Sequence, residues 1–351
     1  MTNRNNSFDL IRHFAALLVL YSHHYALFRY PEPLFPQWDT YGFIAVVIFF
    51  TISGYFMPGS FTSSGNFAVY MAKRCRRIFP GLIVCSFLMS YVIGGIFTPK
   101  PIINYLFNFS TFKTGLMYST FVGRPIPGVF SDFLFQDAIN GSLWTLPIEF
   151  ASYLILGLAL CYSNTWKPVL GLFTLSAITI MTLTYNKIDY SFYAVPMSYL
   201  AMFGVAFTAG SLMSMTQQHW FPIRLNLAIV AVIFLYLFKG RPEMPVLGTL
   251  SLAALVVIIG VSFKDRLING KFDLSYGIYI YAFPVQQITI NLVTHNFWLS
   301  MTLSLILTLI MAYLSYRFVE QPFLYSKAKA RRKTESIESI DTVIEPSASL
   351  S

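Results

Sequence analysis

Long apolar stretches recur along nearly the whole chain, and this feature constrains the fold more than any other. The hydrocarbon core of a bilayer is about 30 Å thick, so a helix of about 20 apolar residues crosses it. Only 11% of the 351 residues are charged and 56% are hydrophobic, whereas about a quarter of the residues in a soluble domain are charged. The sequence therefore predicts an all-α integral membrane protein, a polytopic bundle of helices.

Counting these stretches by length predicts about ten transmembrane helices. They are expected at residues 8–30, 41–58, 80–98, 144–162, 168–185, 193–214, 223–239, 245–263, 273–294 and 297–319. Residues 59–79 are expected to form a cytoplasmic loop, and residues 99–143 the largest outside loop, folded over the outer mouth of the bundle. Residues 1–325 are expected to form the transmembrane domain, and the polar residues 326–351 a disordered cytoplasmic tail.

Lys and Arg residues divide unevenly between the two sides of this topology. With the N-terminus in the cytoplasm, most of the 24 fall inside, as is usual for membrane proteins. The asymmetry predicts cytoplasmic N- and C-termini, and we expect a multi-pass protein of the cell's inner (cytoplasmic) membrane. The same distribution explains the net charge of +9 without a nucleic-acid partner.

Three scattered cysteines, Cys75, Cys85 and Cys161, fit neither a disulfide framework nor a zinc site. No metal is expected.

The first apolar stretch carries Arg12 and His23, with ten residues between them. Eleven helical steps make three turns plus about 20°, so both side chains lie on one face, about 16 Å apart along the axis. If Arg12 marks the membrane edge, His23 lies near mid-membrane, where a titratable imidazole is a functional-site candidate. The alternatives are a border anchor for Arg12 and a structural hydrogen bond for His23. His24 points about 100° away and is expected to pack.

A basic run at residues 73–77 precedes Pro80, where the third span is expected to begin. One interpretation is a positive-inside signal without further function. The other is a site for a polyanion, because the planar guanidinium of arginine binds phosphate through two hydrogen bonds. A cytoplasmic cofactor with several phosphates would fit the second interpretation.

Two further positions are candidates. Ser53-Gly54 makes a thin place on the second span where a ligand or another helix can approach, and helix packing is the common reason for such a pair. Glu149 lies about one and a half turns deeper than Trp144 in the fourth span. A carboxylate at that depth needs a partner or a role.

Five stretches occur in an order that resembles the family-3 membrane acyltransferases over residues 7–325. They are the Arg12–His23 pair, FFTISGY, the basic run leading into RIFP, SLWTLPIEF and the closing RFVEQPF, whose Arg317 and Glu320 alone would indicate an anchor. The resemblance implies transfer of an acyl group, usually acetyl, from cytoplasmic acyl-coenzyme A to a carbohydrate. It also implies that Arg12 and His23 are the essential pair and that Arg74 and Arg77 act with the donor. A family stretch similar to the ninth span often has His where this chain has Ala282, so no catalytic role is assigned there.

Together these features predict a membrane O-acetyltransferase that moves acetyl from acetyl-CoA to a hydroxyl of a cell-surface glycan, with lipopolysaccharide O-antigen as the leading candidate. His23 is expected to act as general base or acyl carrier, Arg12 to hold the donor or orient the helix, and Glu149 to contact the acceptor from outside. The expected catalytic residues are His23, Arg12 and Glu149, and the expected donor-binding residues are Arg74, Arg77, Ser53 and Gly54. The expected partners are acetyl-CoA, a carbohydrate or lipid-linked glycan acceptor, and membrane lipids.

Two other classes of protein remain open. A secondary transporter or flippase of a glycan precursor would share the helices and the buried His, but it would not need a basic phosphate-binding segment. A structural membrane subunit would leave His23 and Glu149 unexplained.

Overall fold

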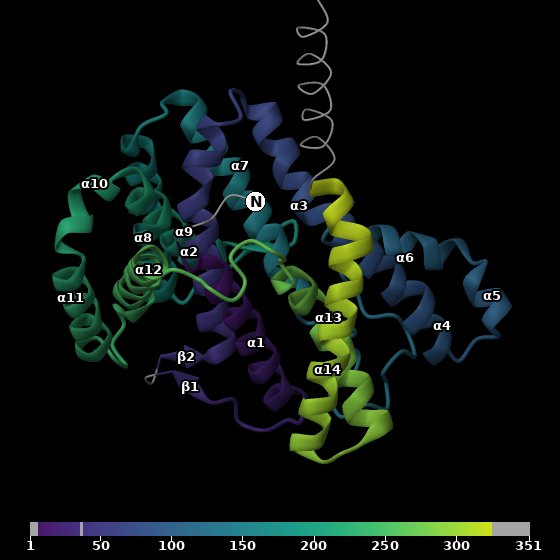
Figure 1. Ribbon diagram of the computed structural model, residues 1–351. Helices are drawn as coiled ribbons and strands as arrows, with labels where there is room; N and C mark the ends of the chain where they lie inside the picture. Colours follow the sequence, from purple (N-terminus) through teal and green to yellow (C-terminus); the bar gives the residue numbers. More distant parts are fainter. Residues whose placement is uncertain (1–5, 36–37, 325–351) are drawn as a thin grey trace, which may run out of the picture.

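The structure is a computed structural model that describes residues 6–35 and 38–324, and helices make up most of it (Figure 1). The α-helices are α1 (Phe8–Leu27), α2 (Tyr41–Thr62), α3 (Phe67–Phe87), α4 (Gly94–Phe97), α5 (Ile102–Leu106), α6 (Phe109–Ser119), α7 (Leu146–Tyr162), α8 (Trp166–Asn186), α9 (Met197–Met215), α10 (Gln217–Trp220), α11 (Arg224–Leu237), α12 (Met244–Ser262), α13 (Ser275–Ile288) and α14 (Phe297–Ser315). The π-helical segments are η1 (Leu88–Ile93), η4 (Thr289–Val293) and η5 (Tyr316–Glu320), and the 3₁₀ segments are η2 (Leu143–Thr145) and η3 (Phe221–Ile223). Two short antiparallel hairpins pair β1 (Leu34–Phe35) with β2 (Asp39–Thr40) and β3 (Ser191–Phe192) with β4 (Val195–Pro196).

Eight helices of the described residues are long and apolar enough to cross a membrane. They cover Tyr41–Thr62, Phe67–Phe97, Leu143–Tyr162, Trp166–Asn186, Met197–Met215, Gln217–Leu237, Met244–Ser262 and Phe297–Leu324. The helical, multi-pass architecture agrees with the prediction. Of the ten predicted spans, the first and ninth correspond to α1 and α13 and are not among these eight. The count of ten and the placement of both termini inside stay predictions, and the predicted tail 326–351 lies outside the described residues.

The basic run is helical, which contradicts the predicted loop at residues 59–79. α2 continues to Thr62, and α3 begins at Phe67, where the Asn66 side chain accepts a hydrogen bond from Val69 N at 2.8 Å. This cap starts the helix well before Pro80, which lies inside α3. Residues 74 and 77 are therefore three apart on one helix and share a face.

Small residues allow α2 and α9 to pack with their backbones in close contact. A Cβ at Gly54 would lie 1.9 Å from Phe207 O, and one at Gly210 would lie 2.2 Å from Thr51 O. In a membrane the hydrophobic effect does not drive helices together, and close packing of this kind contributes to their association instead.

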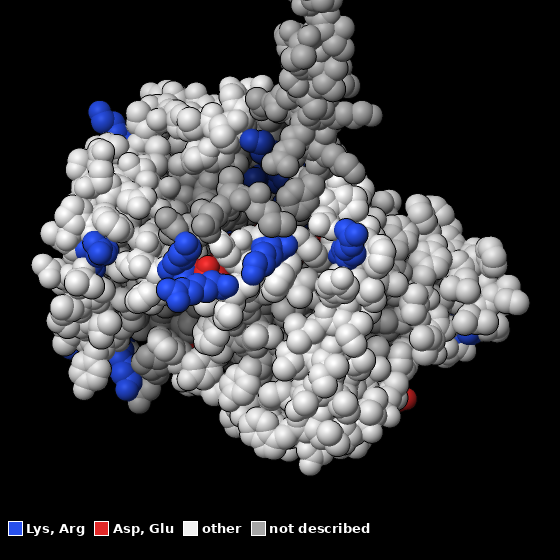
Figure 2. Space-filling model, viewed as in Figure 1, with Lys and Arg blue, Asp and Glu red and all other residues white. Residues whose placement is uncertain are grey.

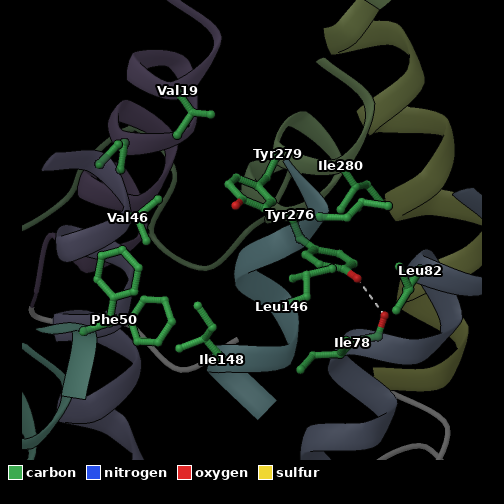
Figure 3. Packing of buried hydrophobic residues seen from close by; sticks show 14 of the residues in the cluster. Val19, Val46, Phe50, Ile78, Leu82, Leu146, Ile148, Tyr276, Tyr279 and Ile280 are labelled. Carbon is green, nitrogen blue, oxygen red and sulfur yellow. Dashed lines mark hydrogen bonds between the residues drawn. The ribbon is translucent and has the colours of Figure 1, made fainter. Parts of the chain in front are cut away.

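Buried side chains from five helices meet in the middle of the bundle (Figure 3). Tyr276 of α13 donates a hydrogen bond to Ile78 O of α3 at 2.7 Å, which ties these helices together. The labelled members of this cluster are Val19 of α1, Val46 and Phe50 of α2, Ile78 and Leu82 of α3, Leu146 and Ile148 of α7, and Tyr276, Tyr279 and Ile280 of α13.

The long connection after α4 does not lie only over the end of the bundle. Helices α4 to α6 lie on one side of the molecule in Figure 1, and a Cβ at Gly115 of α6 would lie 2.8 Å from Ser90 Oγ. Phe121, just after α6, packs on Phe79 with ring centroids 5.6 Å apart. α6 therefore follows α3 deep along its length. The end of the connection binds α13 instead, because Gln287 Nε2 donates to backbone carbonyl oxygens at residues 135 and 138.

Candidate functional site

A cavity of about 510 Å³ brings together five of the seven predicted site residues. The five that line it are Arg12 of α1, Ser53 of α2, Arg74 and Arg77 of α3, and Glu149 of α7. Lys73 and Arg76 also line it, as do Ser275, Tyr276 and Tyr279 of α13. The cavity thus begins among the basic residues of α3 and extends between helices that are far apart in sequence.

Arg74 lies on the cavity wall near two tyrosine rings. Its Nη2 donates to Ser60 Oγ at 3.2 Å, and its guanidinium lies 6.0 Å from the ring centroid of Tyr70 and 5.7 Å from that of Tyr153. Its Nε is buried without a hydrogen-bond partner. Arg74 therefore carries a buried donor that no group of the described residues satisfies.

Arg77 and Arg12 are held by carboxylates. Arg77 Nη2 donates to Asp273 Oδ2 at 2.7 Å, and its Nη1 lies 3.8 Å from Glu320 Oε2. Arg12 Nη1 lies 3.9 Å from Asp273 Oδ2 and 3.8 Å from Asp9 Oδ1. Two of the three predicted arginines of the site, Arg12 and Arg77, are thus ion-paired.

Asp273 is not among the predicted site residues, and Glu320 has a different environment from the one predicted. Glu320 is 2% exposed and accepts a hydrogen bond from Ser315 Oγ at 3.0 Å, while Arg317 donates to Gln321 Oε1 at 2.6 Å. The anchor prediction for this pair is wrong for Glu320, because its side chain turns into the bundle toward Arg77. A carboxylate this deeply buried needs a cation, which Arg77 supplies.

The surroundings of Asp273 favour its ionised form. Burial on its own would raise the pKa of this carboxyl, but the guanidinium groups of Arg77 and Arg12 and the hydrogen bond from Ser275 hold the pKa well below its ordinary value.

Glu149 is paired with hydroxyl groups inside the same cavity. Ser53 Oγ donates to its Oε1 at 3.3 Å, and the Tyr153 hydroxyl donates to the same oxygen. Pro147 and Glu149 lie in the first turn of α7, where a carboxylate is favoured by the helix dipole. The predicted partner of Glu149 exists, and Tyr153, four residues further on α7, was missed although that spacing places it on the same face.

His23 does not line the cavity. Its ring packs edge-on against Phe283 with centroids 5.3 Å apart, and its Nδ1 is buried without a hydrogen-bond partner. Phe283 lies one turn beyond Tyr279 on α13, and Tyr279 lines the cavity and donates to Ser142 O at 2.7 Å. His23 therefore lies beyond the apolar end of the cavity, as the rise of about 16 Å from Arg12 requires.

His24 is a packing residue, as predicted. It is fully buried. Its Nδ1 accepts from Gln286 Nε2 at 3.1 Å, and its Nε2 lies 3.0 Å from Phe297 O and 3.1 Å from Ser300 Oγ. These contacts join α1 to α13 and α14.

Gly54 does not line the cavity either. The structure places it in the contact between α2 and α9, where its missing Cβ is required. The helix-packing alternative accounts for this residue, and its role in donor binding stays a prediction.

The charged surface agrees with a polarised bundle. In Figure 2, Lys and Arg side chains gather across the middle of this face, near the loop that joins α12 to α13, while the lower part of the face is largely uncharged. No group of three or more His, Cys, Asp or Glu side chains suited to a metal ion occurs within residues 6–35 and 38–324.

Comparison with known proteins identifies the family. A family described as an acyltransferase domain matches residues 5–317. The chain belongs to this acyltransferase family. It is 37% identical over 328 residues to an O-acetyl transferase of Shigella phage Sf6, covering 92% of this chain and 97% of the phage protein. It is 27% identical over 355 residues to nodulation protein 10 of Rhizobium leguminosarum bv. viciae, covering 92% and 94% of the two chains. No solved structure matches.

The predicted family and enzyme class are confirmed by these matches. The chain is a multi-pass membrane acyltransferase. The transporter and structural-subunit alternatives receive no support from them.

Proposed function

We propose that this acyltransferase moves an acetyl group from acetyl-CoA to a hydroxyl group of a cell-surface glycan, with lipopolysaccharide O-antigen as the leading acceptor. The observation that carries the proposal is the cavity beside the basic run, where Arg74 offers an unpartnered donor. The similarity to a phage protein named O-acetyl transferase supports the choice of acetyl group and hydroxyl acceptor. In this proposal the protein lies in the inner membrane with both termini and the basic run in the cytoplasm.

The donor would enter from the basic end. Lys73, Arg74 and Arg76 line that part of the cavity, and charge-assisted hydrogen bonds to phosphate are among the strong ones in proteins. The narrow arm that carries the acetyl group would extend between Phe49 and Leu146. An apolar passage suits an uncharged chain and keeps water from the thioester.

The acceptor would approach from the opposite end of the bundle, where His23 lies. As general base, His23 would take the proton of the sugar hydroxyl while its oxygen attacks the thioester carbonyl. The carbon–sulfur bond would then break, and the thiolate of coenzyme A would leave and take up a proton. As acyl carrier, His23 would first bond to the acetyl carbon as the carbon–sulfur bond breaks and coenzyme A leaves, and the sugar oxygen would then take the acetyl group from the imidazole. Its unpartnered Nδ1 suits either role.

Glu149 is proposed to act on the donor side. It lies with Ser53 and Tyr153 in the same cavity as Arg74, so it is better placed to contact the donor than to meet the acceptor from outside. Its carboxylate accepts two hydroxyl hydrogen bonds, which fix its orientation at the wall.

A comparison of envelope glycans with and without the gene tests the proposal. Mass spectrometry should show one acetyl group more on a glycan unit when the gene is present, and NMR should locate it on one hydroxyl. Purified protein in liposomes should consume acetyl-CoA when an acceptor glycan is supplied and should not consume it when the glycan is left out. Transport of a glycan precursor without acetyl transfer would contradict the proposal.

A further inference from the structure

The loop between α12 and α13 ends in a carboxylate that joins three helices. Asp273 stands two residues before Ser275, and 23% of its side chain is exposed. Its Oδ1 accepts from Ser275 N at 3.2 Å and from Ser275 Oγ at 2.6 Å. Its Oδ2 accepts from Arg77 at 2.7 Å and lies 3.9 Å from Arg12. Oδ1 thus accepts hydrogen bonds at the start of α13, and Oδ2 pairs with guanidinium groups from α1 and α3.

The position of Asp273 is fixed from α1. His13 Nδ1 donates to Asp9 O at 2.7 Å, and its Nε2 accepts from Leu274 N at 3.0 Å. Both ring nitrogens have partners, which settles the tautomer and the orientation of the ring. Earlier in the loop, Asp265 accepts three backbone N–H hydrogen bonds within the loop. The loop is therefore a folded support for Asp273.

Each of the two arginines lies between carboxylates. Arg77 has Asp273 on one side and the buried Glu320 on the other. Arg12 has Asp9 and Asp273. A guanidinium paired in this way carries little free positive charge toward a ligand, and its carboxylate partners restrict its side-chain rotamers.

Arg74 differs from both. No ion pair within the described part of the chain involves it, and its Nε has no hydrogen-bond partner. We propose that Asp273 is a positioning residue for acyl transfer: its carboxylate holds Arg77 against the cavity wall, next to Arg12, so that Arg74 remains the guanidinium available to the anionic part of the donor. This inference rests on the proposed function. Groups fixed before the substrate binds need no reorganisation during the reaction.

The test removes the charge of the Asp273 side chain and keeps the shape of the side chain. Asp273→Asn should lower kcat/KM for acetyl-CoA about 10- to 100-fold, the loss expected for one charge-assisted hydrogen bond. Asp273→Glu, which keeps the charge, should recover part of that loss. The matched control is Asp189→Asn, because Asp189 accepts from Ser198 N at 3.3 Å and Ser198 Oγ at 2.8 Å without an arginine partner among the described residues. Its kcat/KM per folded protein should equal that of wild type.

A double-mutant cycle separates positioning from general stability. The double variant Asp273→Asn with Arg77→Gln should have the same kcat/KM as Arg77→Gln alone, because Asp273 acts through Arg77. Near-wild-type kcat/KM in Asp273→Asn, equal loss in Asp273→Asn and Asp189→Asn, or strictly additive losses in the cycle would overturn the inference. If Asp273→Asn alone does not accumulate as folded protein, the double variant, which lacks both charges, takes its place. The kcat/KM of the double variant is then compared directly with that of Arg77→Gln. A lower kcat/KM in the double variant counts against the inference.

Failure of the proposed function and failure of this inference give different results. If the proposed function is wrong, wild-type protein transfers no acetyl group from acetyl-CoA, and the inference falls with it. If only the inference is wrong, wild-type protein is active and the Asp273 variants do not differ from the control.

Discussion

The chemistry of the cavity depends first on Arg74, whose charge no carboxylate of the described residues shares. Arg74→Ala should weaken coenzyme A binding by about 1.5–3 kcal/mol, the range for hydrogen bonds to charged groups. Added salt should weaken wild-type binding in the same direction, because it screens the phosphate contact. Isothermal titration of purified protein measures both effects.

Lys167→Ala provides the control for Arg74→Ala. Lys167 lies in the first turn of α8, is exposed and does not line the cavity. Equal affinity for coenzyme A in the Arg74 and Lys167 variants would mean that the basic run acts only as a topology signal.

His23 and His24 are adjacent, but their surroundings predict opposite effects of replacement. His23→Ala should lower glycan acetylation about 10²- to 10⁴-fold, as expected for the loss of a general base, and should leave the protein folded because its Nδ1 has no hydrogen-bond partner. His24→Ala removes contacts with Gln286, Phe297 and Ser300 from a fully buried site. It should lower the amount of folded protein and spare the activity of the remainder.

Size-exclusion chromatography in detergent measures the amount of folded protein. Glycan acetylation divided by this amount separates a loss of activity from a loss of folded protein. A His23→Ala protein with near-normal acetylation on this scale would refute a catalytic role for His23.

Local spacing predicted part of the site and long-range contacts supplied the rest. Arg74 and Arg77 share a face because they are three residues apart, and Glu149 needed a partner because it lies deep in a span. That Ser53 is this partner, or that Asp273 reaches Arg77 across 196 positions, depends on which loop folds over which helix. No periodicity in the sequence carries that information.

At the scale of the helix, the basic run shows why charge alone misleads. Five consecutive residues with four charges, 73–77, looked like the end of a loop, yet they lie in the first half of α3. The signal for the true start was the cap at Asn66, which the search for apolar stretches passed over because it precedes a polar segment. Helix caps would have corrected the boundary.

The contact between α2 and α9 gives a prediction at the same scale. Gly54→Ala should destabilise the protein by about 1–3 kcal/mol, the usual cost of inserting a methyl group into a packed interface, because the new Cβ would overlap Phe207 O. Gly59→Ala is the matched control, since Gly59 lies on the same helix with nothing within 4 Å of its added Cβ. That change should be neutral or stabilising, because Ala favours a helix over Gly.

Thermal unfolding in one detergent measures both glycine variants. Similar unfolding midpoints for Gly54→Ala and Gly59→Ala would show that α2 and α9 separate easily to admit the added methyl group. Close packing would then no longer explain Gly54, and contact with a ligand would be the better explanation.

For the whole molecule, the order of apolar helices predicted the fold class because the bilayer imposes length and polarity on every span. The order of apolar helices did not predict the segments that are not simple membrane-spanning helices. α6 follows α3 instead of covering only the end of the bundle, and α1 contributes polar groups such as Arg12 and His23 along its length. Such segments are defined by protein neighbours and not by lipid.

The orientation of the bundle leads to the last prediction. If basic residues mark the cytoplasmic side, the turn between α2 and α3 lies inside and the connection after α6 lies outside. Exposed serines occupy both places, Ser63 and Ser131. In a background without Cys75, Cys85 and Cys161, a membrane-impermeant thiol reagent should label Ser131→Cys in spheroplasts, whose inner membrane is intact. Ser63→Cys should be labelled only after that membrane is opened. Labelling of both from the same side would contradict the predicted topology, and with it the entry of the donor at the basic end of the cavity. The reverse pattern would invert the bundle and place Arg74 where no cytoplasmic acetyl-CoA can reach it.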